Sequence, residues 1–140
     1  LFGKQPTPGK ILALPDEKIR EAGLSNAKTK SIKDLSVKIL NNELKLKGIE
    51  HFPPEDITAQ LVTVKGIGPW SVDMFLIFSL GLPDILPVGD LGIRKGMMKL
   101  YGLKKLPDEK TMRRIAKKHN WSPYTSVACW YLWRVVDGVN

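Results

Sequence analysis

The stretch "LVTVKGIGPWSVDMF", residues 61–75, places a Gly-Ile-Gly-Pro turn between two apolar segments with helical periodicity. Glycine adopts positive φ and lets backbones approach, so Gly66 and Gly68 are expected to let two helices cross closely. Pro69 suits the first position of the second helix, where its missing N–H costs nothing. Neighbouring N–H groups beside Lys65 would then stay free to bind an anion such as a DNA phosphate. Such turns also join helices for purely structural reasons.

The composition limits the classes of function that are open to this protein. Its 140 residues contain 22 Lys plus Arg against 14 Asp plus Glu, a net charge of +8 that favours nucleic acid or an acidic membrane surface as partner. Cys129 is the single cysteine, which excludes an internal disulfide and a Cys-built metal site and predicts an intracellular setting. No apolar run reaches the roughly 18 residues of a membrane span. The length predicts one domain, and the start without Met suggests a longer protein.

Apolar residues recur at three- and four-residue steps along the whole sequence, so the expected fold class is all-α. Caps and breakers delimit the expected helices, which lie within residues 14–24, 25–46, 55–64, 69–81, 90–102, 107–120 and 122–138. The fourth of these is almost wholly apolar and is expected to be buried. In the second, one apolar stripe is expected from Ile32, Leu35, Ile39 and Leu40.

Residues 61–80 resemble the helix-hairpin-helix element of a DNA glycosylase superfamily, which is named for that hairpin and for a Gly/Pro-rich loop followed by an aspartate. The stretch "LPDILPVGDLGIRKG" supplies a Pro-Val-Gly loop and then Asp90, twenty residues after Trp70. The resemblance covers nearly the whole chain, from "LFG" at its start to the last helix. It is nearest to the 3-methyladenine branch, which removes alkylated bases.

This resemblance implies a helix-hairpin-helix DNA glycosylase domain over residues 1–140, with the hairpin at 57–80 and the Gly/Pro-Asp loop at 81–90. The family places a wedge residue on a helix that precedes "LFG", so we expect the fold to be incomplete at its N-terminus. We also expect the chain alone to be poorly stable and to excise bases slowly or not at all. Enzymes of this kind turn the base out of the duplex before they cleave it.

Asp90 is the candidate for the chemistry. Cleavage of an N-glycosidic bond builds positive charge on the sugar, which a carboxylate stabilises while it helps to activate water. Asp90 is also a good N-cap for the helix that follows, and the two roles are compatible because a helix N-terminus favours an ionised carboxylate. Asp73 is the rival carboxylate and is expected to be structural. Asp84, in a loop without aromatic neighbours, ranks third.

The resemblance also assigns aromatic residues to a base pocket. Where the branch that cuts the DNA backbone has an attacking lysine, this chain has Trp70, so we expect a monofunctional enzyme that uses water. An indole face attracts a positively charged alkylated base by about 0.5–2 kcal/mol. Trp133 is expected in the pocket and Trp130 in the core. Met74 and Leu91 occupy pocket positions where the family has aromatic residues, which makes this pocket less aromatic.

The remaining expectations concern ligands and partners. No cofactor is expected to be required, although the family binds Na⁺ or K⁺ through main-chain carbonyls that match Val62, Val64 and Gly66. The implied partner is double-stranded damaged DNA, with no membrane and a monomeric protein, in the nucleus or, in a prokaryote, the cytoplasm. Two other readings stay open: a non-catalytic helix-hairpin-helix DNA-binding module, and a related glycosylase for uracil or hypoxanthine.

Overall fold

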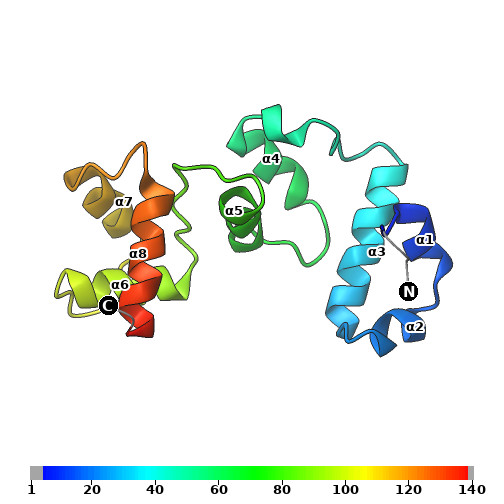
Figure 1. The fold of residues 1–140 in the computed structure, drawn as a ribbon, viewed down its shortest axis with the longest axis horizontal. Coiled ribbons are helices and arrows are strands. Elements are labelled where there is room, and N and C mark those ends of the chain that lie inside the picture. The colour runs from blue at the N-terminus through cyan, green and yellow to red at the C-terminus, as the bar shows by residue number, and fades with distance from the viewer. Residues whose placement is uncertain (1–4, 139–140) are drawn as a thin grey trace. The chain divides into compact units, whose positions relative to one another are not determined.

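The computed structural model describes residues 5–138, so the "LFG" at which the family resemblance begins lies outside the described residues. Helices alone make up the regular structure of this part, which confirms the all-α fold class. In chain order they are α1 (Pro8–Ala13), α2 (Asp16–Glu21), α3 (Asn26–Leu40), the 3₁₀-helix η1 (Ile49–His51), α4 (Pro54–Leu61), α5 (Pro69–Phe78), α6 (Leu91–Leu100), α7 (Glu109–Lys118) and α8 (Thr125–Asp137), as Figure 1 shows.

The chain divides into two compact units, Leu1–Gly68 and Pro69–Asn140. The boundary falls inside the turn of the hairpin expected at 57–80, with α4 in the first unit and α5 in the second. The crossing of these two helices, and the organisation of residues 1–140 as one glycosylase domain, therefore stay predictions.

In the first unit, α1 and α2 pack against the longer α3, which begins after an N-cap at Ser25 as expected. The expected apolar stripe of α3 is wrong in detail, because Ile32 and Ile39 are only half-buried and Leu40 is exposed. The buried residues of α3 are instead Thr29 and Ser36, seven residues apart on one face. Side chains this small let a neighbouring helix approach closely, and the Ser36 hydroxyl is satisfied by donating to the Ile32 carbonyl at 2.7 Å.

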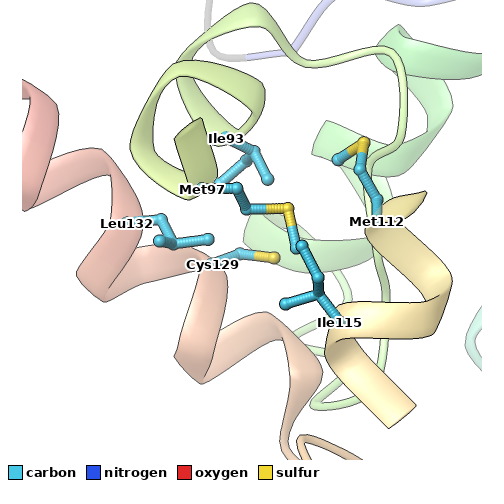
Figure 2. Packing of buried hydrophobic residues seen from close by; sticks show 6 residues of the cluster. All are labelled: Ile93, Met97, Met112, Ile115, Cys129 and Leu132. Carbon is cyan, nitrogen blue, oxygen red and sulfur yellow. The ribbon is translucent and has the colours of Figure 1, made fainter. Parts of the chain in front are cut away.

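In the second unit, side chains of α6, α7 and α8 meet in one core (Figure 2). Its buried members are Ile93, Met97, Met112, Ile115, Cys129 and Leu132. The helix α5 buries Val72 and Leu76, one turn apart on a single face, whereas Trp70 and Phe78 are exposed. The expectation that the apolar α5 is buried as a whole is therefore wrong, because packing within the described residues covers only one face of it.

Candidate active site

The carboxylate of Asp90 lies at the start of α6, where it acts as the N-cap that its sequence position predicts. Its Oδ1 accepts a hydrogen bond from the Ile93 backbone N–H at 2.8 Å and another from Trp133 Nε1 at 2.9 Å. Its Oδ2 accepts one from Trp70 Nε1 at 2.7 Å. Only 7% of the residue is exposed. Three N–H donors and the positive end of a helix thus hold this buried negative charge in one orientation.

The two tryptophans reach Asp90 from different elements: Trp70 from the first turn of α5, and Trp133 from α8. The Trp70 N–H is bound to Asp90. Because Trp70 is 50% exposed, much of its ring nevertheless remains accessible to a ligand. The ring of Trp133 lies against Phe78, with 5.6 Å between ring centroids. The structure therefore places both predicted tryptophans at the predicted carboxylate.

Sequence reasoning missed Phe78, which is 63% exposed beside Trp133. The signal was present in the sequence, because Trp70, Met74 and Phe78 recur every four residues and so share one face of α5. Met74 itself is half-buried. Leu91, directly after Asp90, is exposed. The surroundings of Asp90 thus contain one aromatic ring more than the sequence analysis predicted.

Trp130 is not a core residue, contrary to expectation. It is 46% exposed, with the guanidinium of Arg134 4.8 Å from its ring centroid and the ring of Tyr131 edge-on at 5.2 Å. Successive residues of a helix point about 100° apart. Cys129 and Leu132, on either side of Trp130 in the sequence, point into the core. This geometry leaves Trp130 on the outside of α8.

The rival carboxylates lie in different environments. Asp84 accepts hydrogen bonds from the Ser122 hydroxyl at 2.6 Å, from the Thr125 hydroxyl and from the Thr125 backbone N–H, and these bonds lower its pKa. It joins the loop before α6 to the start of α8, which is a structural role. Asp73, half-buried on α5, has its pKa raised to about 6 by desolvation, opposed by the charge of Arg113. No N–H donor is found for it among residues 69–138.

The glycine turn is held by α3 within the first unit. Gly66 has φ +81°, and a Cβ on it would lie 2.3 Å from the Ser31 hydroxyl oxygen, so this position requires glycine. The Lys65 backbone N–H donates to Asp34 Oδ2 at 2.7 Å. The Ile67 N–H donates to the Val64 carbonyl at 3.0 Å. The expectation that the N–H groups of this turn are free is therefore wrong for Lys65 and Ile67.

Gly68 differs from Gly66. Its φ is not positive, and a Cβ built on it would meet no described atom within 4 Å, so neither backbone conformation nor packing explains the glycine. The Lys65 side chain is exposed beside the turn. The structure thus leaves open space at Gly68.

Two further observations concern metals and membranes. Among residues 5–138 no cluster of three His, Cys, Asp or Glu side chains could hold a metal ion. No helix in that range is long and apolar enough to cross a membrane. The main-chain carbonyls of Val62, Val64 and Gly66 lie in or next to the turn, and that of Val64 already accepts the Ile67 N–H. A carbonyl oxygen has two lone pairs, so Val64 retains one for a cation.

Comparison with known proteins identifies the family of this chain. The model of the HhH-GPD superfamily base excision DNA repair proteins matches residues 1–121. The chain belongs to this superfamily. DNA-3-methyladenine glycosylase 1 of Schizosaccharomyces pombe is 35% identical over 133 residues, which cover 94% of this chain and 58% of that protein.

Two solved structures have the same helix-hairpin-helix glycosylase fold. The S. pombe 3-methyladenine DNA glycosylase in complex with abasic DNA matches with a TM-score of 0.80 and 33% identity, over 92% of this chain and 62% of that one. A DNA-3-methyladenine glycosidase from Bacillus halodurans gives a TM-score of 0.79 and 34% identity, over 96% and 61% of the two chains. The chain thus spans roughly three fifths of the length of these relatives.

Proposed function

We propose that this protein is a monofunctional DNA glycosylase that hydrolyses the N-glycosidic bond of alkylated, 3-methyladenine-type bases in base excision repair. The observation that carries the proposal is the carboxylate of Asp90, buried and oriented by two indole N–H groups beside accessible aromatic rings. The names of the relatives support the substrate class.

In this proposal Asp90 stabilises the positive charge that develops on the deoxyribose as the bond to the base breaks. Its Oδ1 already accepts two hydrogen bonds and Oδ2 accepts one, so Oδ2 retains more capacity for a water or for the sugar. Water then adds to the sugar carbon, and Asp90 helps to take up its proton. An alkylated purine carries positive charge and leaves readily, so one oriented carboxylate is sufficient.

The accessible ring of Trp70 would receive the charged base by stacking and cation–π attraction. Its indole nitrogen cannot act as an attacking amine, so no covalent enzyme–DNA intermediate forms at this position. The glycine turn would grip the DNA backbone, with Gly68 leaving room for a phosphate and Lys65 neutralising charge. A sodium or potassium ion held by the carbonyls of Val62, Val64 and Gly66 would add positive charge there, and no other cofactor is required.

The partner in this proposal is double-stranded damaged DNA, bound by a monomer in the compartment that holds the DNA of the cell. The test is base release under single-turnover conditions from duplexes that carry 3-methyladenine, 7-methylguanine, hypoxanthine or uracil. Release of the methylated bases supports the proposal. Release of uracil or hypoxanthine alone would indicate a glycosylase for another lesion. Tight binding without any release, also by a chain extended N-terminally by about 60 residues, would indicate a DNA-binding module.

A further inference from the structure

Two glycines on one face of α6 determine how closely α8 can approach it. Gly96 is buried, and a Cβ on it would lie 2.7 Å from the Leu132 carbonyl oxygen and 3.0 Å from the Leu132 Cβ. Gly92 lies one turn earlier, on the same face. The two helices are therefore in contact through backbone atoms at Leu132, the residue before Trp133.

At Gly92 the neighbouring atoms belong to the candidate active site itself. A Cβ there would lie 2.9 Å from Trp133 Cδ1, 3.1 Å from Trp133 Nε1 and 3.1 Å from Asp90 Oδ1. These are the two side chains joined by the 2.9 Å hydrogen bond from Trp133 Nε1 to Asp90 Oδ1. A methyl group at position 92 would thus occupy the space beside that bond. Glycine leaves this space free, and the bond from Trp133 Nε1 to Asp90 Oδ1 lies directly next to it.

Backbone conformation gives no other reason for glycine at this position. Gly92 is not among the glycines with positive φ, and it lies within the regular helix α6. Alanine is ordinarily favoured over glycine in a helix. The glycine therefore runs against local helix preference, and among residues 5–138 the atoms nearest to a Cβ at this position would be those of Trp133 and Asp90.

We propose that Gly92 is a positioning residue, whose missing side chain lets the Trp133 indole N–H reach Asp90 and fix the carboxylate for base excision. Gly96 supports the same approach one turn away by admitting the α8 backbone. The effect on the reaction rests on the function proposed above. The effect on the Trp133–Asp90 contact does not, and it can be measured without DNA.

The first test is therefore spectroscopic and uses Gly92→Ala. The four tryptophans give four indole N–H signals in a ¹H–¹⁵N spectrum, which Trp→Phe variants assign one by one. We expect the Trp133 signal to shift in Gly92→Ala as its bond to Asp90 lengthens. The control is Gly9→Ala, the same change on α1, where a Cβ meets no described atom within 4 Å and no indole signal should move. An unchanged Trp133 signal in folded Gly92→Ala overturns the proposal.

The second test measures single-turnover base release and DNA affinity. Weakening one hydrogen bond to a charged acceptor predicts about tenfold slower release for Gly92→Ala with the DNA dissociation constant unchanged. In a Trp133→Phe background, where the indole N–H is absent, Gly92→Ala should slow release much less than it does in the native background. Equal slowing in both backgrounds would overturn the proposal. If the Trp133 signal shifts but no base is released by the native chain, nor by a chain extended N-terminally by about 60 residues, the result would instead count against the proposed function.

Gly92→Ala could fail to fold, so Trp133→Phe alone provides a further test. It removes the indole N–H and leaves Gly92 and the Asp90 N-cap bond to Ile93 in place. We expect release to slow by about tenfold with unchanged DNA affinity. Base release at the native rate would show that the Trp133 contact does not position Asp90. That result would also overturn the proposed role of Gly92.

Discussion

Replacing Asp90 by asparagine changes the charge of the site while it retains most of its shape. Asparagine is as good an N-cap as aspartate, so its carbonyl oxygen can still accept from the Ile93 N–H and from Trp133 Nε1. Its NH₂ group then replaces the oxygen that lies 2.7 Å from Trp70 Nε1, which brings two donors together. The substitution therefore breaks one hydrogen bond to a charged acceptor and removes the negative charge.

The loss of that bond should cost about 2 kcal/mol of folding free energy, since hydrogen bonds to charged groups contribute about 1.5–3 kcal/mol. At about 4 °C per kcal/mol, the melting temperature should fall by about 8 °C. Base release should slow by about 10²–10³-fold, the cost of removing a group that stabilises charge in a transition state. Duplex affinity should be unchanged or higher, because a negative charge near phosphates has been removed. Thermal melting, single-turnover release and fluorescence anisotropy measure these three quantities.

The matched control is Asp73→Asn on α5. The Asp73 carboxylate has no N–H donor among residues 69–138, so its substitution should retain excision and should not lower the melting temperature. If Asp90→Asn melts like the native chain, the bond to Trp70 contributes no stability. If Asp90→Asn excises normally while Asp73→Asn does not, the assignment of the chemistry to Asp90 is wrong.

Three further predictions follow from the same contacts. Borohydride should trap no covalent protein–DNA adduct during turnover, because Trp70 offers no amine, and a trapped adduct would contradict hydrolysis by water alone. Gly68→Ala should weaken binding to all duplexes alike at unchanged melting temperature. Lys65→Ala should reduce the steepness of the plot of log affinity against log salt concentration by about 0.9. A loss of affinity confined to particular DNA sequences would exclude binding of the DNA backbone by this turn. The pKa of Asp73, raised from 3.8 to about 6 by burial, means that the folded state binds the proton more tightly, so stability should fall as pH rises through this range. Without solvent screening, the free energy of unfolding would fall by about 3 kcal/mol over this pH range; with screening, the fall should be about 1–2 kcal/mol. Asp73→Asn should remove this fall, and melting curves at pH 4 and pH 7 that change equally in both proteins would contradict the assignment.

Local sequence determined where the helices begin and how the turn is built. Ser25 and Asp90 cap the helices that follow them, Pro69 opens α5, and Gly66 takes the positive φ that the turn requires. Each of these features depends on backbone groups within a few residues, so a single sequence contains the information. The same local signal placed Asp90 at a helix N-terminus, where its charge is favoured.

Tertiary structure alone decided which side chains meet at Asp90. Its partners lie 20 residues before it and 43 residues after it, and periodicity did not distinguish Trp133, which reaches the carboxylate, from Trp130, which lies outside α8. The choice depends on the rotation and approach of α8 against α6, which the backbone contact at Gly96 sets. Such contacts form between segments distant in sequence, and their geometry depends on how whole helix faces pack, which no local pattern specifies.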